Sequence, residues 1–283
     1  LVPLRTARKA DYVGWITILG RLVAVAFFFG LTASGVDADQ SLWCSIVAGD
    51  FALALSAYVI TPRRLRIKLT FRLRINPWEG ARWYSVIALC RSARQLDLPI
   101  VGAIAGSAAA GVYGGVNRWI QPMLIATSAF SSAAAPFIAR ETDFRRLRGP
   151  VLRATPLLAL PLALSIGLIV FADWLVPFLL GAEYSESAPV LQWLAAAMIL
   201  NIAGQPMLIV LQARRFDHMA AGIFLVSVVV QLTTVAALAS TIGALGAGIG
   251  FFVCQALQFI GAAICLIVIV SRRTHGIRSL LNR

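Results

Sequence analysis

The sequence predicts an all-α integral membrane protein with about eight transmembrane helices. Of its 283 residues, 59% are hydrophobic and 13% are charged, whereas a soluble domain has roughly 45–50% and about 25%. Residues 154–172 and 187–213 contain no charged side chain, and about 20 apolar residues cross the hydrocarbon core once. Residues 219–271 are also uncharged and are long enough for two crossings, with Gly243 and Gly246 marking the turn between them.

The same reading divides the whole chain into predicted helices joined by short connections. Their approximate ranges are residues 12–35, 41–60, 83–105, 112–138, 154–175, 189–211, 219–241 and 244–270. No connection is long enough to form a large extramembrane domain, which argues against a soluble catalytic domain.

The basic residues support this count and give an orientation. Of 25 Lys and Arg residues, 21 lie in alternate connections and in the two tails. These segments are residues 5–9, 63–82, 140–153, 214–215 and 272–283. The opposite connections contain neither Lys nor Arg. Because cytoplasmic connections carry the excess of basic residues, we expect a multi-pass protein with both termini in the cytoplasm.

Several classes of function are disfavoured by composition. A net charge of +13 indicates nucleic-acid binding only when a soluble domain presents a basic face, so no nucleic-acid partner is expected. The cysteines show no Cys-x-x-Cys spacing, and each of the two histidines lies beside arginines at the end of an apolar run. We therefore expect neither a disulfide framework, a metal site nor a cofactor. The cysteines are Cys44, Cys90, Cys254 and Cys265.

Six charged residues lie deep inside the predicted helices: Arg21, Asp50, Arg91, Arg94, Asp97 and Arg118. A charge at the centre of the membrane costs at least about 2.5–3.5 kcal/mol, so such residues normally face a bundle interior or a wet cavity. Four arginines against two acids leave an excess of positive charge. This excess suggests an anionic ligand.

Arg91, Arg94 and Asp97 are spaced i, i+3 and i+6, which places them in one stripe. A guanidinium suits phosphate because its planar fork donates two parallel hydrogen bonds. The alternatives are pairing of Arg94 with Asp97 and of Arg21 with Asp50, and snorkelling of Arg91 to the interface.

Arg118 either snorkels outward or contacts a phosphate or a sugar. The uncharged polar residues within the helices suit either sugar hydroxyls or helix packing, which is the expected role. They are Gln95, Asn201, Gln205, Gln231, Gln255 and Gln258.

Three stretches of the sequence resemble a known family. One runs from Gln95-Leu-Asp97 through Gly111-Val-Tyr113 and Asn117-Arg118 to Ala135-Pro136 and Arg140; the others are Leu180-Gly-Ala-Glu-Tyr184 and Gly243-Ala-Leu-Gly246-Ala. In this order they resemble the O-antigen type of polysaccharide flippase in the multidrug/oligosaccharidyl-lipid/polysaccharide exporter superfamily.

The resemblance implies a partial version of a bundle with two lobes of six helices. Residues 1–60 would be a two-helix remnant of the N-terminal lobe, and residues 61–82 the basic cytoplasmic linker. Residues 83–271 would form the six-helix C-terminal lobe, and residues 272–283 a basic tail. Four helices of the first lobe would be lacking, so either such helices or polysaccharide assembly proteins are expected as partners. The linker would also meet anionic membrane lipids, or serve only as a topological anchor.

The resemblance further implies a flippase rather than an enzyme, placed in the bacterial inner membrane. It would move an undecaprenyl-pyrophosphate-linked oligosaccharide for lipopolysaccharide or another surface polysaccharide by alternating access. Arg21, Arg91, Arg94 and Arg118 would bind the substrate, with no catalytic residue. Asp50 or Asp97 is a candidate for carrying a proton or sodium ion, or else serves as a structural, paired acid.

Two alternatives remain at this point. In a membrane glycosyltransferase or polymerase, Asp37 and Asp39 would be a metal-binding pair, but the external connections are short for an acceptor domain. A drug exporter of the same superfamily would prefer acids in its cavity, and the excess of arginines argues against it.

Overall fold

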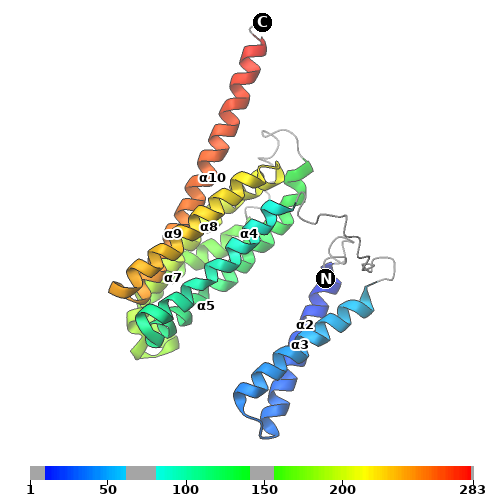
Figure 1. Cartoon of the computed structure of the whole chain (residues 1–283), viewed down its shortest axis with the longest axis vertical. Helices are drawn as coiled ribbons and strands as arrows, with labels where there is room; N and C mark the ends of the chain where they lie inside the picture. The colour runs from blue at the N-terminus through cyan, green and yellow to red at the C-terminus, as the bar shows by residue number, and fades with distance from the viewer. Residues whose placement is uncertain (1–9, 62–80, 141–155, 282–283) are drawn as a thin grey trace. The chain divides into compact units, whose positions relative to one another are not determined.

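The computed structural model describes residues 10–61, 81–140 and 156–281, and all regular structure in these ranges is helical. The chain divides into two compact units, Leu1–Asn76 and Pro77–Arg283 (Figure 1). The division falls within the predicted linker, residues 61–82, most of which lies outside the described residues. The same holds for most of the basic connection at residues 140–153.

The first unit is a helical hairpin made of α2 (Ala10–Ala33) and α3 (Ala38–Ile60). The two helices approach most closely at two glycines. A Cβ atom on Gly20 would lie 2.9 Å from the Cβ of Leu53, and one on Gly49 would lie 2.7 Å from the Cβ of Ala24. Small residues allow such backbone contact, which is a common basis of helix packing in membranes.

The second unit contains the remaining helices. They are α4 (Arg82–Ala93), the 3₁₀ helix η2 (Arg94–Leu96), α5 (Asp97–Arg140), α7 (Pro156–Leu180), the 3₁₀ helix η3 (Ala182–Ser187), α8 (Ala188–Ala213), α9 (Asp217–Ile242) and α10 (Ala244–Leu281). Figure 1 shows α8, α9 and α10 alongside the folded α4–α5 segment.

Helix α5 is folded back on itself at Gly106. This residue has φ 88° and ψ 170°, a backbone conformation that is essentially restricted to glycine. Residues on either side of it meet: a Cβ atom on Gly102 would lie 3.5 Å from the Cβ of Ala110, and one on Gly114 would lie 3.4 Å from Leu98. The segment therefore crosses twice, with residues before Gly106 in one arm and residues after it in the other.

The predicted all-helical membrane fold is confirmed. Seven helical spans in the described residues are long and apolar enough to cross a membrane, and one of them, Arg82–Ser131, contains the fold at Gly106. Several boundaries differ from those predicted from sequence. The connection expected at residues 106–111 is a single glycine, the one at 181–188 is mostly a 3₁₀ helix, and the last helix continues beyond residue 270 to Leu281.

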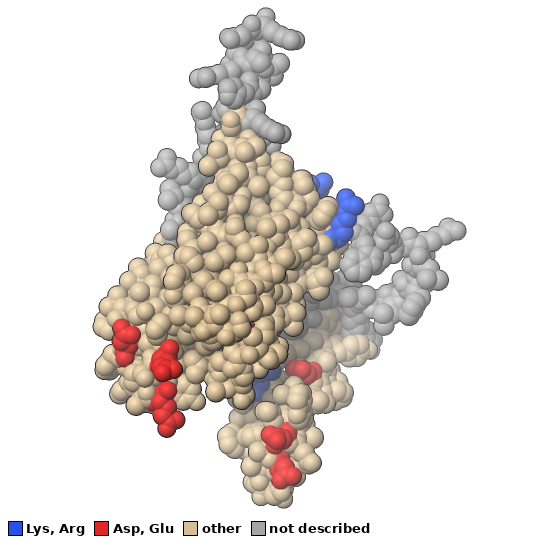
Figure 2. All heavy atoms as spheres, turned by 60° about the vertical axis from the view of Figure 1, so that its left-hand side comes forward, with Lys and Arg blue, Asp and Glu red and all other residues tan. Residues whose placement is uncertain are grey.

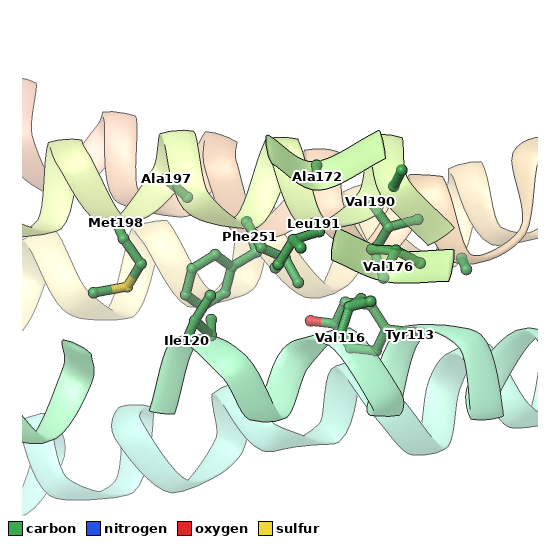
Figure 3. Close-up of a cluster of buried hydrophobic side chains, with 14 of the residues drawn as sticks. Tyr113, Val116, Ile120, Ala172, Val176, Val190, Leu191, Ala197, Met198 and Phe251 are labelled. Atoms are coloured by element: carbon green, nitrogen blue, oxygen red, sulfur yellow. The ribbon is translucent and has the colours of Figure 1, made fainter. Parts of the chain in front are cut away.

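The main core of the second unit lies around α8. In the most apolar 18-residue stretch of α8, 61% of the residues are buried, compared with 33% in that of α9. Tyr113 and Ile120 of α5, Leu191 of α8 and Phe251 of α10 meet in this core (Figure 3). In the view of Figure 2, acidic side chains lie at the end of the unit opposite its C-terminus, and the broad surface beyond them is uncharged. Such a surface suits contact with acyl chains.

Candidate functional site

The site begins with a change of helix type between α4 and α5. Pro99 has no amide hydrogen, and its ring conflicts with the carbonyl of residue 95 in a regular α-helix. The preceding turn, Arg94–Leu96, is a 3₁₀ helix, so the continuous helix predicted over residues 83–105 is interrupted. Side chains three residues apart eclipse one another in a 3₁₀ helix. This geometry places Arg94 and Asp97 on one side of the segment.

The two arginines of this segment lie against aromatic rings of neighbouring helices. The Cζ atom of Arg94 is 5.0 Å from the ring centroid of Phe251 in α10, and that of Arg91 is 5.4 Å from the ring centroid of Phe224 in α9. Both rings are 3% exposed. A guanidinium over an aromatic face gains about 0.5–2 kcal/mol. The rings thus hold both arginines without neutralising their charge.

Asp97 is 4% exposed and accepts three hydrogen bonds. The hydroxyl of Tyr113 donates to Oδ2 at 2.6 Å, Nε2 of Gln231 donates to the same oxygen at 3.2 Å, and the amide of Leu98 donates to Oδ1 at 2.7 Å. Tyr113 and Gln231 are fully buried. The carboxylate therefore ties the start of α5 both to the other arm of α5 and to α9.

A cavity of about 370 Å³ opens beside this network. It is lined by Arg91, Arg94, Gln95, Asp97, Leu98, Asn117, Gln121, Leu124 and Phe251. Arg94 lies twelve residues after Arg82 and twelve before Gly106, which is about 18 Å from each end at 1.5 Å per residue. A hydrocarbon core is about 30 Å thick, so Arg94 lies near the middle of the first crossing of this candidate membrane span.

The cavity carries more positive than negative charge. Two guanidinium groups and one carboxylate line it. Across the described ranges, 10–61, 81–140 and 156–281, no ion pair within 4.0 Å joins Arg94 to Asp97. The pairing considered from sequence is therefore replaced by hydrogen bonds from neutral donors. With Asp97 ionised, the lining presents an excess of one positive charge to an entering anion.

The other predicted site residues lie elsewhere. Arg118 is exposed and does not line the cavity, although its neighbour Asn117 does. Arg21 and Asp50 are exposed residues of the first unit, and each directly follows one of the two close-packed glycines. The structure brings together Arg91, Arg94 and Asp97. A binding role for Arg21 and Arg118 and an ion-coupling role for Asp50 remain predictions.

Most of the uncharged polar residues form helix-to-helix contacts, as expected. Nδ2 of Asn201 donates to Oε1 of Gln255 at 3.1 Å, and the hydroxyl of Ser131 donates to Oε1 of Gln205 at 3.0 Å. Gln231 instead holds Asp97. Within the part of the chain that the structure describes, no group of three or more His, Cys, Asp or Glu side chains could hold a metal ion.

Sequence reasoning missed Gln121, Phe224 and Phe251 as parts of the site. Gln121 could have been found, because it stands four residues after Asn117 and shares its helix face. The two phenylalanines resemble any other apolar residue in the sequence. Their role depends on how α9 and α10 pack against α4 and η2.

Comparison with known proteins places these observations in a family. No curated protein and no solved structure matches the chain. A family model described as polysaccharide biosynthesis protein matches residues 8–189, well over half of the chain, and this range contains every predicted site residue. The resemblance to polysaccharide flippases of the exporter superfamily is thereby confirmed. The chain is a multi-pass membrane protein that belongs to the polysaccharide biosynthesis protein family.

Proposed function

We propose that this protein is a transporter, not an enzyme, that moves a lipid-linked oligosaccharide across the bacterial inner membrane. The substrate would be an undecaprenyl-pyrophosphate-linked oligosaccharide used for lipopolysaccharide or another surface polysaccharide. Two facts support a transport role in this pathway: the family match and the bundle of apolar helices without a soluble domain in the described residues. Movement would occur by alternating access between helical lobes.

The observation that carries the proposal is the cavity with Arg91 and Arg94. A diphosphate is a compact anion that accepts several hydrogen bonds, and guanidinium groups recognise it in a forked geometry. The surrounding low dielectric strengthens this attraction. The single acid of the cavity already accepts three hydrogen bonds. This arrangement favours an anionic substrate over the organic cations of a drug exporter.

The lipid tail of the substrate would remain in the bilayer while its headgroup enters the cavity. Arg21 and Arg118 are proposed as further contacts along the path of the headgroup, because an intramembrane arginine is costly unless it is solvated or paired. Asp50 and Asp97 remain proposed candidates for ion coupling. Asp97 also has the structural role described above, so the two roles need separate tests.

The proposal is tested by complementation of a surface-polysaccharide export defect in a strain that lacks the gene. We expect Arg94→Gln and Arg91→Gln to lower export more than tenfold, since a charge-assisted hydrogen bond contributes about 1.5–3 kcal/mol. The matched control is Arg82→Gln, an exposed arginine at the start of α4 that does not line the cavity. Normal export from both cavity variants at normal membrane levels would contradict the proposal.

The proposed orientation has both termini in the cytoplasm. It rests on the distribution of Lys and Arg between alternate connections. In a variant without native cysteines, Asp39→Cys should react with an impermeant external reagent and Arg146→Cys should not. Labelling of Arg146→Cys alone would reverse the proposed orientation.

A further inference from the structure

The cavity has two walls that belong to the two arms of the folded α4–α5 segment. On the first arm, Arg91, Arg94, Gln95 and Leu98 line it with the spacing i, i+3, i+4 and i+7. Residues with this spacing lie on one face of a helix. This wall contributes both of the guanidinium groups in the cavity.

The second wall is uncharged. Asn117, Gln121 and Leu124 follow one another with the spacing i, i+4 and i+7 on the arm after Gly106. They also share one helix face. This wall contributes two amide side chains and no charge.

The two walls are in register. Residues equidistant from Gly106 lie side by side, as the contact between Leu98 and Gly114 shows. Continued along the arms, this register sets Gln95 level with Asn117, and Arg91 level with Gln121. An anion held by the arginines would therefore place its attached group directly against the amides.

The amides of the cavity are available to a ligand. In the described part of the chain, the side chains of Gln95, Asn117 and Gln121 have no hydrogen-bond partner, whereas the buried Asn201 and Gln255 bond to each other. A primary amide both donates and accepts hydrogen bonds. A phosphate only accepts, but a sugar hydroxyl does both. The amide wall thus suits a hydroxylated neutral group better than it suits a phosphate.

The cavity has the size of a small-ligand site. Its volume is about 370 Å³, and such sites measure about 300–1,000 Å³. The cavity is not enclosed, so a diphosphate and the first sugar ring can occupy it while the rest of an oligosaccharide lies outside.

We propose that Asn117 and Gln121 are specificity-determining residues, which recognise the sugar ring attached directly to the diphosphate held by Arg91 and Arg94. This inference rests on the proposed function and adds the part of the substrate that the protein distinguishes. Sugars further along the oligosaccharide would then have little effect on binding.

The test measures binding to the purified full chain in lipid nanodiscs. The probes are undecaprenyl diphosphate and the same lipid carrying one hexose, one 6-deoxyhexose or one N-acetylhexosamine. The wild-type protein should bind at least one sugar-bearing probe more tightly than the bare diphosphate. Asn117→Leu and Gln121→Met should each reduce this preference, measured as the ratio of the affinities for the sugar-bearing and the bare diphosphate, roughly 2- to 10-fold, as expected for the loss of one neutral hydrogen bond.

The control is Gln212→Met, because Gln212 is a half-buried glutamine of α8 that does not line the cavity. It should leave the preference intact. If the wild-type protein binds the bare diphosphate but prefers no sugar-bearing probe, or if a variant that carries both Asn117→Leu and Gln121→Met keeps the preference, the inference is wrong and the proposed function stands. If the wild-type protein binds none of these lipids, the proposed function itself fails and the inference fails with it.

Discussion

The acids inside the membrane spans have different surroundings in the two units. In the two-helix unit, only 11% of the residues in the most apolar 18-residue stretch of each helix are buried. Arg21 and Asp50 are exposed. In the second unit, 61% of the residues in the corresponding stretch of α8 are buried. Asp97 is also buried there, and it accepts hydrogen bonds from three donors. The donors of Asp97 come from both arms of α5 and from α9. Enclosing a carboxylate at this depth therefore takes at least three helical segments.

The two exposed charges of the hairpin lie on one of its faces. Its helices are antiparallel and cross at Gly20 and Gly49, and Arg21 and Asp50 each come one residue after a crossing glycine. In an antiparallel pair, the residues that follow the two contact positions point to the same side. One face of the hairpin therefore carries both charges. We expect this face to be covered by protein or water, because acyl chains would leave the charges unsolvated.

The largest effect is expected from comparing the two acids. Asp97→Ala should lower the free energy of unfolding of the second unit by about 3 kcal/mol, because the buried hydroxyl of Tyr113 and the amide of Gln231 lose their acceptor, at about 1–3 kcal/mol each. Asp50→Ala should change stability by less than about 0.5 kcal/mol, as for most surface substitutions.

Stability can be followed in each unit by thiol labelling during SDS titration. Cys254 is buried and reports on the second unit. Cys44 is exposed and is replaced, and Ile16→Cys, at a side chain that is 1% exposed, reports on the first unit. Asp97→Asn keeps the size of the side chain and an acceptor oxygen, and should show a smaller loss. Equal effects of Asp97→Ala and Asp50→Ala would remove the contrast between the units.

The next effect concerns helix contacts. A Cβ atom on Gly49 would lie 2.8 Å from the backbone oxygen of Gly20, and one on Gly250 would lie 2.6 Å from Cγ2 of Val235. Overpacking costs typically about 1–3 kcal/mol. Gly49→Ala should separate α2 from α3 more than Gly250→Ala separates α10 from α9. The hairpin consists of a single helix-to-helix interface, whereas α10 is also held by its contacts with α8 and α5.

Disulfide cross-linking measures this separation. Cysteines introduced at Val13 and Ala57, which pack together in the hairpin, should cross-link less in the Gly49→Ala background. Gly30→Ala is the control, since no atom lies within 4 Å of its added Cβ. A stronger loss from Gly30→Ala than from Gly49→Ala would show that close packing at the crossing does not hold the hairpin together.

A smaller effect is expected from the aromatic rings behind the arginines. Phe251→Leu removes the aromatic face beneath Arg94 but keeps an apolar side chain. A cation–π contact contributes about 0.5–1 kcal/mol or more, so the affinity for undecaprenyl diphosphate should fall roughly 2- to 5-fold. Phe28→Leu in the hairpin, where the ring of Phe28 packs edge-on against that of Phe29, should leave the affinity unchanged.

The last comparison concerns one type of turn that the two units build with different residues. The amide of Val36 bonds to the carbonyl of Leu31 after α2, and the amide of Phe216 bonds to that of Leu211 after α8. The left-handed position before each amide is Gly35, with φ 87°, or Arg215, with φ 63°. This pattern is a Schellman motif, in which glycine is favoured.

The two turns give a reciprocal pair of substitutions. A side chain in the left-handed conformation costs about 1–2 kcal/mol, so Gly35→Ala should destabilise the hairpin by about 1 kcal/mol. Arg215→Asn should stabilise the second unit by less than that, because asparagine tolerates this conformation better than arginine. Thermal unfolding in detergent compares both variants with the parent protein. Stabilisation by Gly35→Ala would contradict this reading of the turn.

The sequence alone determined the membrane class, the number of crossings and most helix ranges. These features follow from local properties: the length of each apolar stretch and the positions of charges between them. The stripe of Arg91, Arg94 and Asp97 could also be predicted, since spacing along one helix fixes the shared face. The switch to a 3₁₀ helix at Arg94 was not predicted, although Pro99 was visible as a source of irregular backbone.

The tertiary structure alone decided which residues complete the site. The partners of Asp97 and Arg94 lie far along the chain, at Gln231 and Phe251, and nothing in their local sequence distinguishes them from packing residues. The reversal at Gly106 set the amides of Asn117 and Gln121 opposite the arginines. Spacing along the sequence could not predict this, because the amides and the arginines lie on different arms of the folded segment. Local hydrophobicity fixes how a helix enters the membrane, but only the packing of helices against one another decides which polar groups meet inside it.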